Sequence, residues 1–182
     1  MSKMKKMTVP ILAIYLWVLM TIFGAIVLET FMIYPNIFHN PPQSLELSME
    51  FFVEAGPSDF FPPLGFASWV LGALALILTW KIPRARWWIV LSLAMMVGEG
   101  LASMLYFWPR NDIMFIEGSA VHSDEYLRQV ANEFVTWHAR SRMVFNTVAA
   151  VAAFVAFLAA YRQRVVTARA GREPRVSAVP NS

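Results

Sequence analysis

Ionisable side chains inside apolar stretches are the residues of this sequence that could do chemistry. Glu29 and Glu99 interrupt two such stretches, and His138, Arg142 and Asn146 follow one another at intervals of four in a third. Residues spaced by four lie one above the other on a single helix face. Ionisable groups are costly in lipid, so they usually face a partner or a water-filled cavity. We therefore predict one polar pocket, with Arg142 between Glu29 and Glu99.

Three further residues, Ser103, Tyr106 and Trp137, are expected beside this network, together with several methionines. A simpler interpretation is also open, because a buried Glu–Arg pair can serve only to fix helix packing. The two interpretations differ in whether the polar groups surround a hollow or close-packed side chains.

A metal site is a minor alternative for the same region. His39, His122 and His138, with Glu29 and Met32, could hold copper or iron, since imidazole suits both metals. His39 and His122 have no second ligand three or four residues away, so the spacing gives this site little support. The chain has no cysteine, which excludes disulfides, iron–sulfur clusters and thiol redox catalysis. We expect no metal and no other cofactor.

Four apolar stretches must position these side chains. The sequence is 58% hydrophobic and 15% charged, an apolar excess beyond that of a soluble domain of this size. The apolar residues fall into continuous runs rather than the alternation of a barrel, so the runs are predicted to cross a membrane as helices. The predicted spans are about 9–33, 64–80, 87–108 and 140–161. The predicted fold is an all-α integral membrane four-helix bundle.

The connections between the spans differ in length. The turn at 81–86 is short enough to make an antiparallel hairpin. The loops at 34–63 and 109–139 are longer, and we expect them to form a partly helical extracytoplasmic cap. Within the first loop, about 44–54 has an amphipathic helical pattern. In the second, a helix is predicted to start at Ser123 or Asp124 and run into the last span.

One membrane domain is predicted for residues 1–165, followed by a disordered cytoplasmic tail at 166–182. A cleaved signal peptide is the alternative for the first run, because lysines precede it. That run is longer than the usual apolar region of a signal peptide, about 7–15 residues, and no small-residue cleavage motif follows it. We expect the segment to be retained as a helix.

The charge distribution predicts the orientation in the membrane. Eleven of the fifteen basic residues lie in the N-terminal segment, the 81–86 turn and the C-terminal segment, while most acids lie in the two long loops. We expect the protein to lie in the inner (plasma) membrane. By the positive-inside rule, both termini are then expected in the cytoplasm. Lipid headgroups account for the basic residues, so no nucleic-acid partner is expected.

Short motifs near the ends of the spans resemble those of the anthrone oxygenase-like family of small four-helix membrane proteins. The resemblance covers about 20–160 and depends mainly on Trp108-Pro109-Arg110-Asn111 and on Trp137-His138-Ala139-Arg140-Ser141-Arg142. Two features depart from that family: Tyr34 stands where a histidine often precedes the proline ending the first helix, and Glu99 does not belong to its motif.

This resemblance implies oxygenation of an electron-rich polyphenolic anthrone to a quinone without metal or flavin. It implies that His138 is the base that removes a phenolic proton and that Arg142 and Asn111 stabilise the resulting oxyanion. We therefore expect a membrane oxygenase-like protein acting on or binding a hydrophobic aromatic or quinone-type molecule.

Two other functions stay open at this stage. The first is a non-catalytic binding or assembly partner that holds a lipid, a quinone or a protein. The second is a small transporter, for which the sequence lacks the usual repeated halves and broken helices. Membrane lipids are expected partners in each case, and a homodimer is plausible because four short helices bury little surface.

Overall fold

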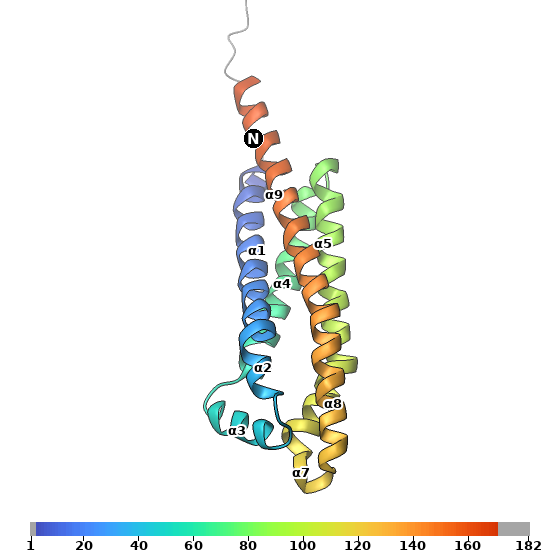
Figure 1. Cartoon of the computed structure of the whole chain (residues 1–182). Helices are drawn as coiled ribbons and strands as arrows, with labels where there is room; N and C mark the ends of the chain where they lie inside the picture. Colours follow the sequence, from blue (N-terminus) through green and yellow to red (C-terminus); the bar gives the residue numbers. More distant parts are fainter. Residues whose placement is uncertain (1–2, 171–182) are drawn as a thin grey trace, which may run out of the picture.

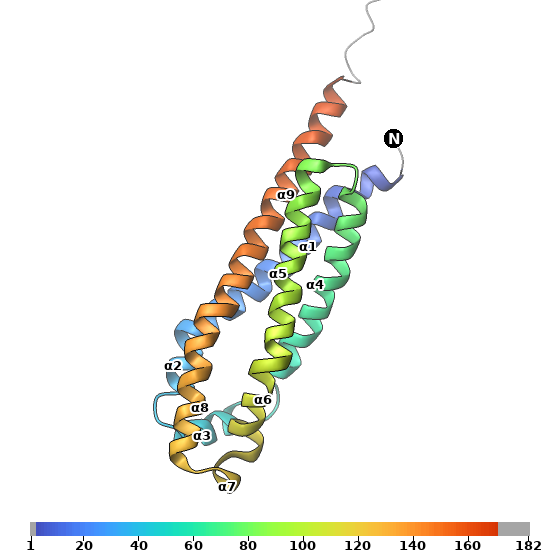
Figure 2. The same ribbon diagram turned by 90° about the vertical axis from the view of Figure 1, so that its right-hand side faces the viewer.

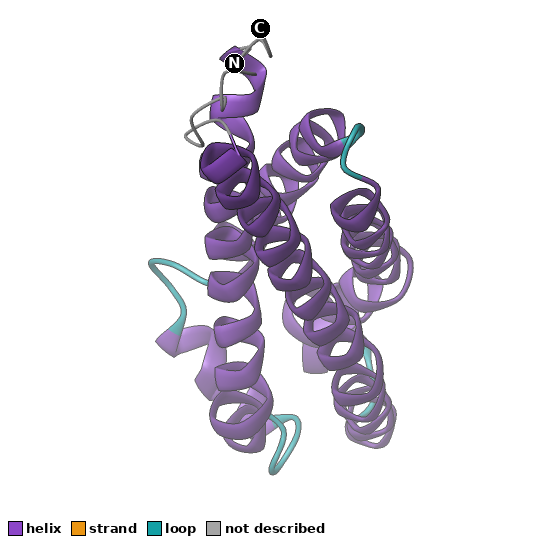
Figure 3. Ribbon diagram, turned by 90° about the horizontal axis from the view of Figure 1, so that it is seen from above, coloured by secondary structure: helices purple, strands orange, loops and turns teal. Residues whose placement is uncertain are grey.

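The computed structural model describes residues 3–170. Among these residues, four helical stretches are long and apolar enough to cross a membrane, which agrees with the predicted four-span helical architecture. They cover Lys6–Ile37, Pro57–Thr79, Pro83–Val121 and Asp124–Thr167. The stretches run side by side as a bundle (Figure 1), and the described elements are all helices or loops (Figure 3).

Short π-helical segments, labelled η, interrupt three of the four stretches. The first stretch contains α1 (Lys3–Leu28), η1 (Glu29–Ile33) and α2 (Tyr34–Ile37), and α3 (Gln43–Phe51) follows it. The second is α4 (Pro57–Thr79). The third contains α5 (Pro83–Ala102), η2 (Ser103–Phe107), α6 (Trp108–Asn111), η3 (Asp112–Glu117) and α7 (Gly118–Val121). The fourth contains α8 (Asp124–Trp137), η4 (His138–Arg142) and α9 (Met143–Ala170).

The two ends of the bundle differ in structure and charge. One end, called the cap end, is formed by α2, α3, α6, α7 and the first turns of α8 (Figure 1). The start of α1, the turn between α4 and α5 and the end of α9 lie together at the other end, called the termini end (Figures 1 and 2). The segments that carry most of the basic residues therefore share one end of the molecule.

The two long connections are more helical than predicted. α4 begins at Pro57 rather than near residue 64, so Pro62 and Pro63 lie inside it. Its start is favoured by proline at the first helical position and by the Gly56 N–H, which donates to Asp59 Oδ2 at 2.9 Å. The predicted loop 109–139 is also mostly helical, because the chain passes from α5 into α7 through π-helical segments instead of leaving the bundle.

The last helical stretch begins where it was predicted to begin and ends later than predicted. Ser123 caps α8 by accepting a hydrogen bond from the Tyr126 N–H at 3.3 Å, as expected for a helix that starts there. α9 continues through 166–170, which were predicted to belong to a disordered tail. The remainder of that predicted tail, 171–182, lies outside the described residues.

Small residues bring the four long helices close together. Ala149, Ala153 and Ala156 on α9 are almost fully buried in the core shared with α1 and α5. Gly100 on α5 faces the indole ring of Trp69 on α4, and a Cβ at Gly100 would overlap that ring. Such contacts are the usual means of helix association in a membrane, where backbones approach through small side chains.

Candidate functional site

The π-helical segments carry most of the polar residues in the interior near the cap end. Glu29 begins η1, Ser103 begins η2, and His138 and Arg142 are the two ends of η4. Each of these four residues is buried. Single π-helical turns within α-helices occur frequently at functional sites. The backbone is therefore locally irregular at the place where the sequence predicted a polar pocket.

Arg142 is held by a carboxylate of the neighbouring helix α5. Its Nε donates to Glu99 Oε1 at 2.7 Å, and both side chains are about 10% exposed. The Ser103 hydroxyl donates to the same carboxylate oxygen at 3.0 Å. Hydrogen bonds between ionised groups are roughly twice as strong as neutral ones. Glu99 therefore fixes the position of the guanidinium and does not itself line a cavity.

His138 is fully buried between the first and last spans. Its Nε2 lies 3.4 Å from Arg142 NH1 and 3.7 Å from Glu29 Oε2. On its other side, Nδ1 lies 3.4 Å from the Thr30 hydroxyl oxygen. The Tyr34 ring packs edge-on against the imidazole, with ring centroids 4.5 Å apart. All described polar contacts of His138 are thus with side chains of the protein.

Glu29 has an oxygen that no protein group satisfies. Its Oε2 is buried and has no hydrogen-bond partner. The Tyr34 hydroxyl interacts with both Glu29 and Arg142. A buried carboxylate oxygen without a partner is rare and calls for an explanation such as a water or a ligand. The Glu29 side chain also lines the pocket described next, whereas Oε2 itself has almost no exposed surface and lies on the His138 side.

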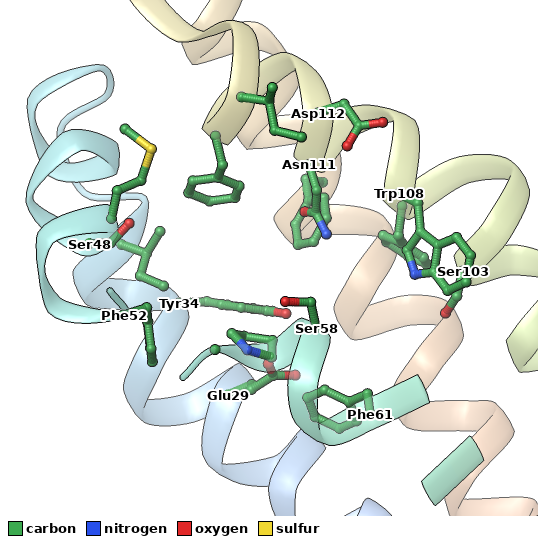
Figure 4. A pocket seen from close by; sticks show the side chains of 18 of the residues that line it. Glu29, Tyr34, Ser48, Phe52, Ser58, Phe61, Ser103, Trp108, Asn111 and Asp112 are labelled. Atoms are coloured by element: carbon green, nitrogen blue, oxygen red, sulfur yellow. The ribbon is translucent and has the colours of Figure 1, made fainter. Parts of the chain in front are cut away.

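A pocket of about 660 Å³ opens above Glu29 and Arg142 toward the cap end. This volume is within the usual range for a small-molecule site, about 300–1,000 Å³. Figure 4 shows Glu29, Tyr34, Ser58 and Phe61 close together at its floor, with Asn111 across the cavity from them. The aromatic residues of its wall are Tyr34, Phe38, Phe52, Phe61, Phe107, Trp108, Phe115 and Phe134.

The walls place aromatic rings around the cation. The Arg142 guanidinium carbon lies 5.1 Å from the Phe61 ring centroid and 5.8 Å from that of Phe107. Both distances are within the range of cation–π attraction. Flat aromatic walls around a fixed guanidinium and a carboxyl group suit a planar aromatic molecule that carries a polar group at one edge.

The predicted site residues fall into two groups around this pocket. Glu29, Arg142 and Asn111 line it. His138 and Glu99 lie behind the lining and contact Arg142. The polar residues predicted to meet in the interior are therefore gathered at one place, and His138 reaches the pocket only through its neighbours.

Asn146 lies one turn along α9 from Arg142. Its Nδ2 donates to the Arg142 carbonyl oxygen at 2.9 Å, and its buried Oδ1 has no protein partner. It does not line the pocket. It extends the polar face of the last helix toward the core.

Tyr106 and Trp137 lie outside the pocket that was predicted to include them. The Arg110 guanidinium stacks over the Tyr106 ring at 3.6 Å, and the ring of Trp137, which is half exposed, lies 6.3 Å from that of Tyr106. The physical reason is the rotation of η2 about its axis: Phe107 turns inward and is 2% exposed, so the adjacent Tyr106 faces the outer side, where α6 meets α8.

Several residues that line the pocket or contact His138 were not identified from the sequence. Tyr34 is five residues after Glu29, a spacing that brings two side chains together in a π-helix and not in an α-helix. Thr30 is a common helix residue with no special pattern. Phe61 fell in a segment that was predicted to be a loop, so no periodicity placed it near Arg142.

The three histidines have separate environments. The Nδ1 of His39 bonds to the Asn36 carbonyl oxygen, and His122 pairs with Glu117. Within residues 3–170, no three His, Cys, Asp or Glu side chains are grouped so that they could hold a metal ion. The alternative of a histidine metal site therefore has no set of ligands among the described residues.

The chain was also compared with known proteins. No protein-family model, no curated protein and no solved structure matches it. An inference about function must then come from the chemistry of the site. That chemistry consists of a carboxylate with a free oxygen, a fixed guanidinium beside it, and a hollow with aromatic walls.

Proposed function

We propose that this protein binds a planar, hydrophobic phenolic molecule in the pocket at the cap end and oxidises it with O₂. The observation that carries the proposal is the Glu29 carboxyl group, which lines an aromatic cavity that the Arg142 guanidinium also lines. A carboxylate in that position can accept a proton from a ligand, and the guanidinium can stabilise the anion that results. The resemblance to anthrone oxygenases is consistent with this chemistry.

The reaction can be written with an anthrone as the substrate. Removal of one proton gives a resonance-stabilised carbanion, which combines with O₂ at the ring methylene carbon. Loss of the second proton from that carbon breaks the O–O bond and forms the C=O bond of the quinone, and water leaves. In total the CH₂ group loses four electrons, one O₂ accepts them, and one oxygen atom enters each of quinone and water.

The residues take different parts in this scheme. Glu29 is the base that touches the ligand, since its side chain lines the pocket. Arg142 and Asn111 stabilise negative charge on the ligand oxygen. His138, which the sequence suggested as the base, lies behind Glu29 and can act on the ligand only through it. Glu99 positions Arg142.

The proposed setting is the inner (plasma) membrane, with both termini in the cytoplasm. The basic residues of the termini end support this orientation through the positive-inside rule. The pocket then lies in the outer half of the bundle, where a hydrophobic ligand can partition from the lipid. Membrane lipids are the expected surroundings, and a homodimer is compatible with the exposed apolar helix faces.

The test is quinone production by purified protein in lipid nanodiscs supplied with O₂ and a dihydroxyanthrone. We expect Glu29→Gln and Arg142→Met each to lower the rate at least about 100-fold, the lower range for loss of an acid–base or electrostatic contribution. The matched controls are Glu125→Gln and Arg140→Met, because both native side chains are exposed and neither lines the pocket. Wild-type rates in both pocket variants would overturn the assignment.

A non-catalytic binding protein is the second candidate, favoured by the aromatic walls, which do not by themselves imply turnover. In that case wild type would form no quinone above the rate of heat-denatured protein. It would still quench or shift the fluorescence of the added anthrone, and Arg142→Met would abolish the shift. The two functions thus give different results with the same reagents.

A further inference from the structure

The hydrogen-bond partners of His138 define which of its two nitrogens carries the proton. The Thr30 hydroxyl has one hydrogen, and it donates that hydrogen to the Ile26 carbonyl oxygen at 2.7 Å. The Thr30 oxygen can therefore only accept from His138 Nδ1, which lies 3.4 Å away. A hydrogen bond at this contact requires the proton to be on Nδ1.

The contacts on the other side of the ring lead to the same result. Arg142 NH1 has no lone pair and can only donate, and it lies 3.4 Å from His138 Nε2. Nε2 must then be the unprotonated nitrogen of the neutral imidazole. Its lone pair accepts from Arg142, while Glu29 Oε2, 3.7 Å from Nε2, is beyond hydrogen-bond distance. Two independent donors and acceptors thus select one tautomer.

We propose that Thr30 is a positioning residue that fixes the neutral tautomer of His138, with the proton on Nδ1 and the lone pair of Nε2 turned toward Arg142. In metal sites and triads, a hydroxyl or carboxylate behind a histidine sets its tautomer in the same way. Thr30 touches neither the pocket nor any ligand in it. Its effect on chemistry passes entirely through His138.

This arrangement lets the cluster accept one proton. The charged and titratable groups that face His138 are Glu29 and Tyr34 from the first span and Arg142 from its own helix, with Glu99 of α5 on the far side of Arg142. With both glutamates and Arg142 ionised and His138 neutral, the buried cluster carries one net negative charge. One added proton makes it neutral, which low-dielectric surroundings favour.

The proton would move in two steps, and this consequence rests on the proposed function. The O–H or C–H bond of the ligand breaks as an O–H bond forms on Glu29 Oε2. Glu29 returns this proton to the peroxide oxygen that forms when the carbanion combines with O₂, while His138 stays neutral. Glu29 then regains its charge, accepts the second proton from the same carbon as the O–O bond breaks, and gives it to the departing hydroxide, which leaves as water.

The tautomer itself can be measured without any ligand. We would record ¹⁵N NMR spectra of histidine-labelled full-length protein in lipid nanodiscs, with His39→Gln and His122→Gln so that His138 is the sole histidine. The expected wild-type spectrum has a proton-coupled Nδ1 and an uncoupled Nε2. In Thr30→Val the ratio of Nδ1–H to Nε2–H should fall at least about fivefold, as expected for the loss of one neutral hydrogen bond. Thr30→Ser should restore it.

Thr21→Val is the matched control, because Thr21 makes the same hydrogen bond four residues back in α1 but is exposed and far from any histidine. It should leave the spectrum unchanged. A wild-type Nε2–H tautomer, or a Thr30→Val spectrum like that of wild type, would overturn the inference, and the wild-type spectrum decides even if Thr30→Val does not fold. Quinone production is measured separately, so failure of the oxygenase proposal leaves the tautomer result standing.

Discussion

Removal of the Glu99 carboxylate gives the sharpest test of the buried ion pair. Glu99→Ala leaves the Arg142 guanidinium inside the bundle without its partner at 2.7 Å, and both side chains are about 10% exposed, so water screens the pair very little. Breaking a buried pair on one side costs about 3–5 kcal/mol because it leaves an uncompensated charge. For a chain of this size, 3 kcal/mol corresponds to a fall in Tm of about 6–12 °C.

The assay is thermal unfolding in detergent, followed by tryptophan fluorescence. The control is Glu133→Ala, which removes the carboxylate of the partly exposed Arg110–Glu133 pair, and we expect a far smaller shift there. The double variant Glu99→Ala with Arg142→Met should be more stable than the sum of its single changes, because the second change removes the orphaned charge. Equal shifts for Glu99→Ala and Glu133→Ala, or additivity in the double variant, would refute the reasoning.

Two further predictions concern packing in the bundle. Gly100→Ala should destabilise the protein by about 1–3 kcal/mol because the new Cβ overlaps the Trp69 ring. At Gly24 a new Cβ meets no atom within 4 Å, so Gly24→Ala should stabilise the protein by about 0.5–1 kcal/mol. A lower Tm for Gly24→Ala than for Gly100→Ala would contradict this. Ser92→Ala should cost about 1–3 kcal/mol because the buried Tyr15 hydroxyl, 2.8 Å from Ser92 Oγ, loses its partner. Adding Tyr15→Phe to Ser92→Ala should recover part of the lost Tm, and a further fall would count against the hydrogen bond.

The four membrane-length helices could be predicted from the sequence because hydrophobic length is a local property. The short hairpin near Pro83 and the helix start at Ser123 were predicted from local signals as well, and both are present. The helix boundaries at the cap end could not be predicted, because proline and polar residues there suggested loops. Pro62 and Pro63 lie inside α4, which starts a full turn and more before the predicted span.

The composition of the site could be predicted only in part. The interval of four between His138 and Arg142 placed both on one helix face, and the cost of burying charge implied that they would meet the carboxylates Glu29 and Glu99. The sequence could not distinguish lining residues from supporting ones. The family resemblance implied that His138 meets the ligand, whereas the described contacts of His138 are with Thr30, Glu29 and Arg142.

Length, hydropathy and charge asymmetry were enough to predict four membrane-length helices with the acidic and basic segments at opposite ends. Only the tertiary structure decided that Glu99 accepts from the Nε of Arg142 and that an oxygen of Glu29 has no hydrogen-bond partner. It also placed an aromatic hollow above these groups. The physical reason is that these contacts depend on how far each helix is rotated about its axis. That rotation is set by the π-helical turns and by close packing at small residues, and this packing joins segments distant in the sequence.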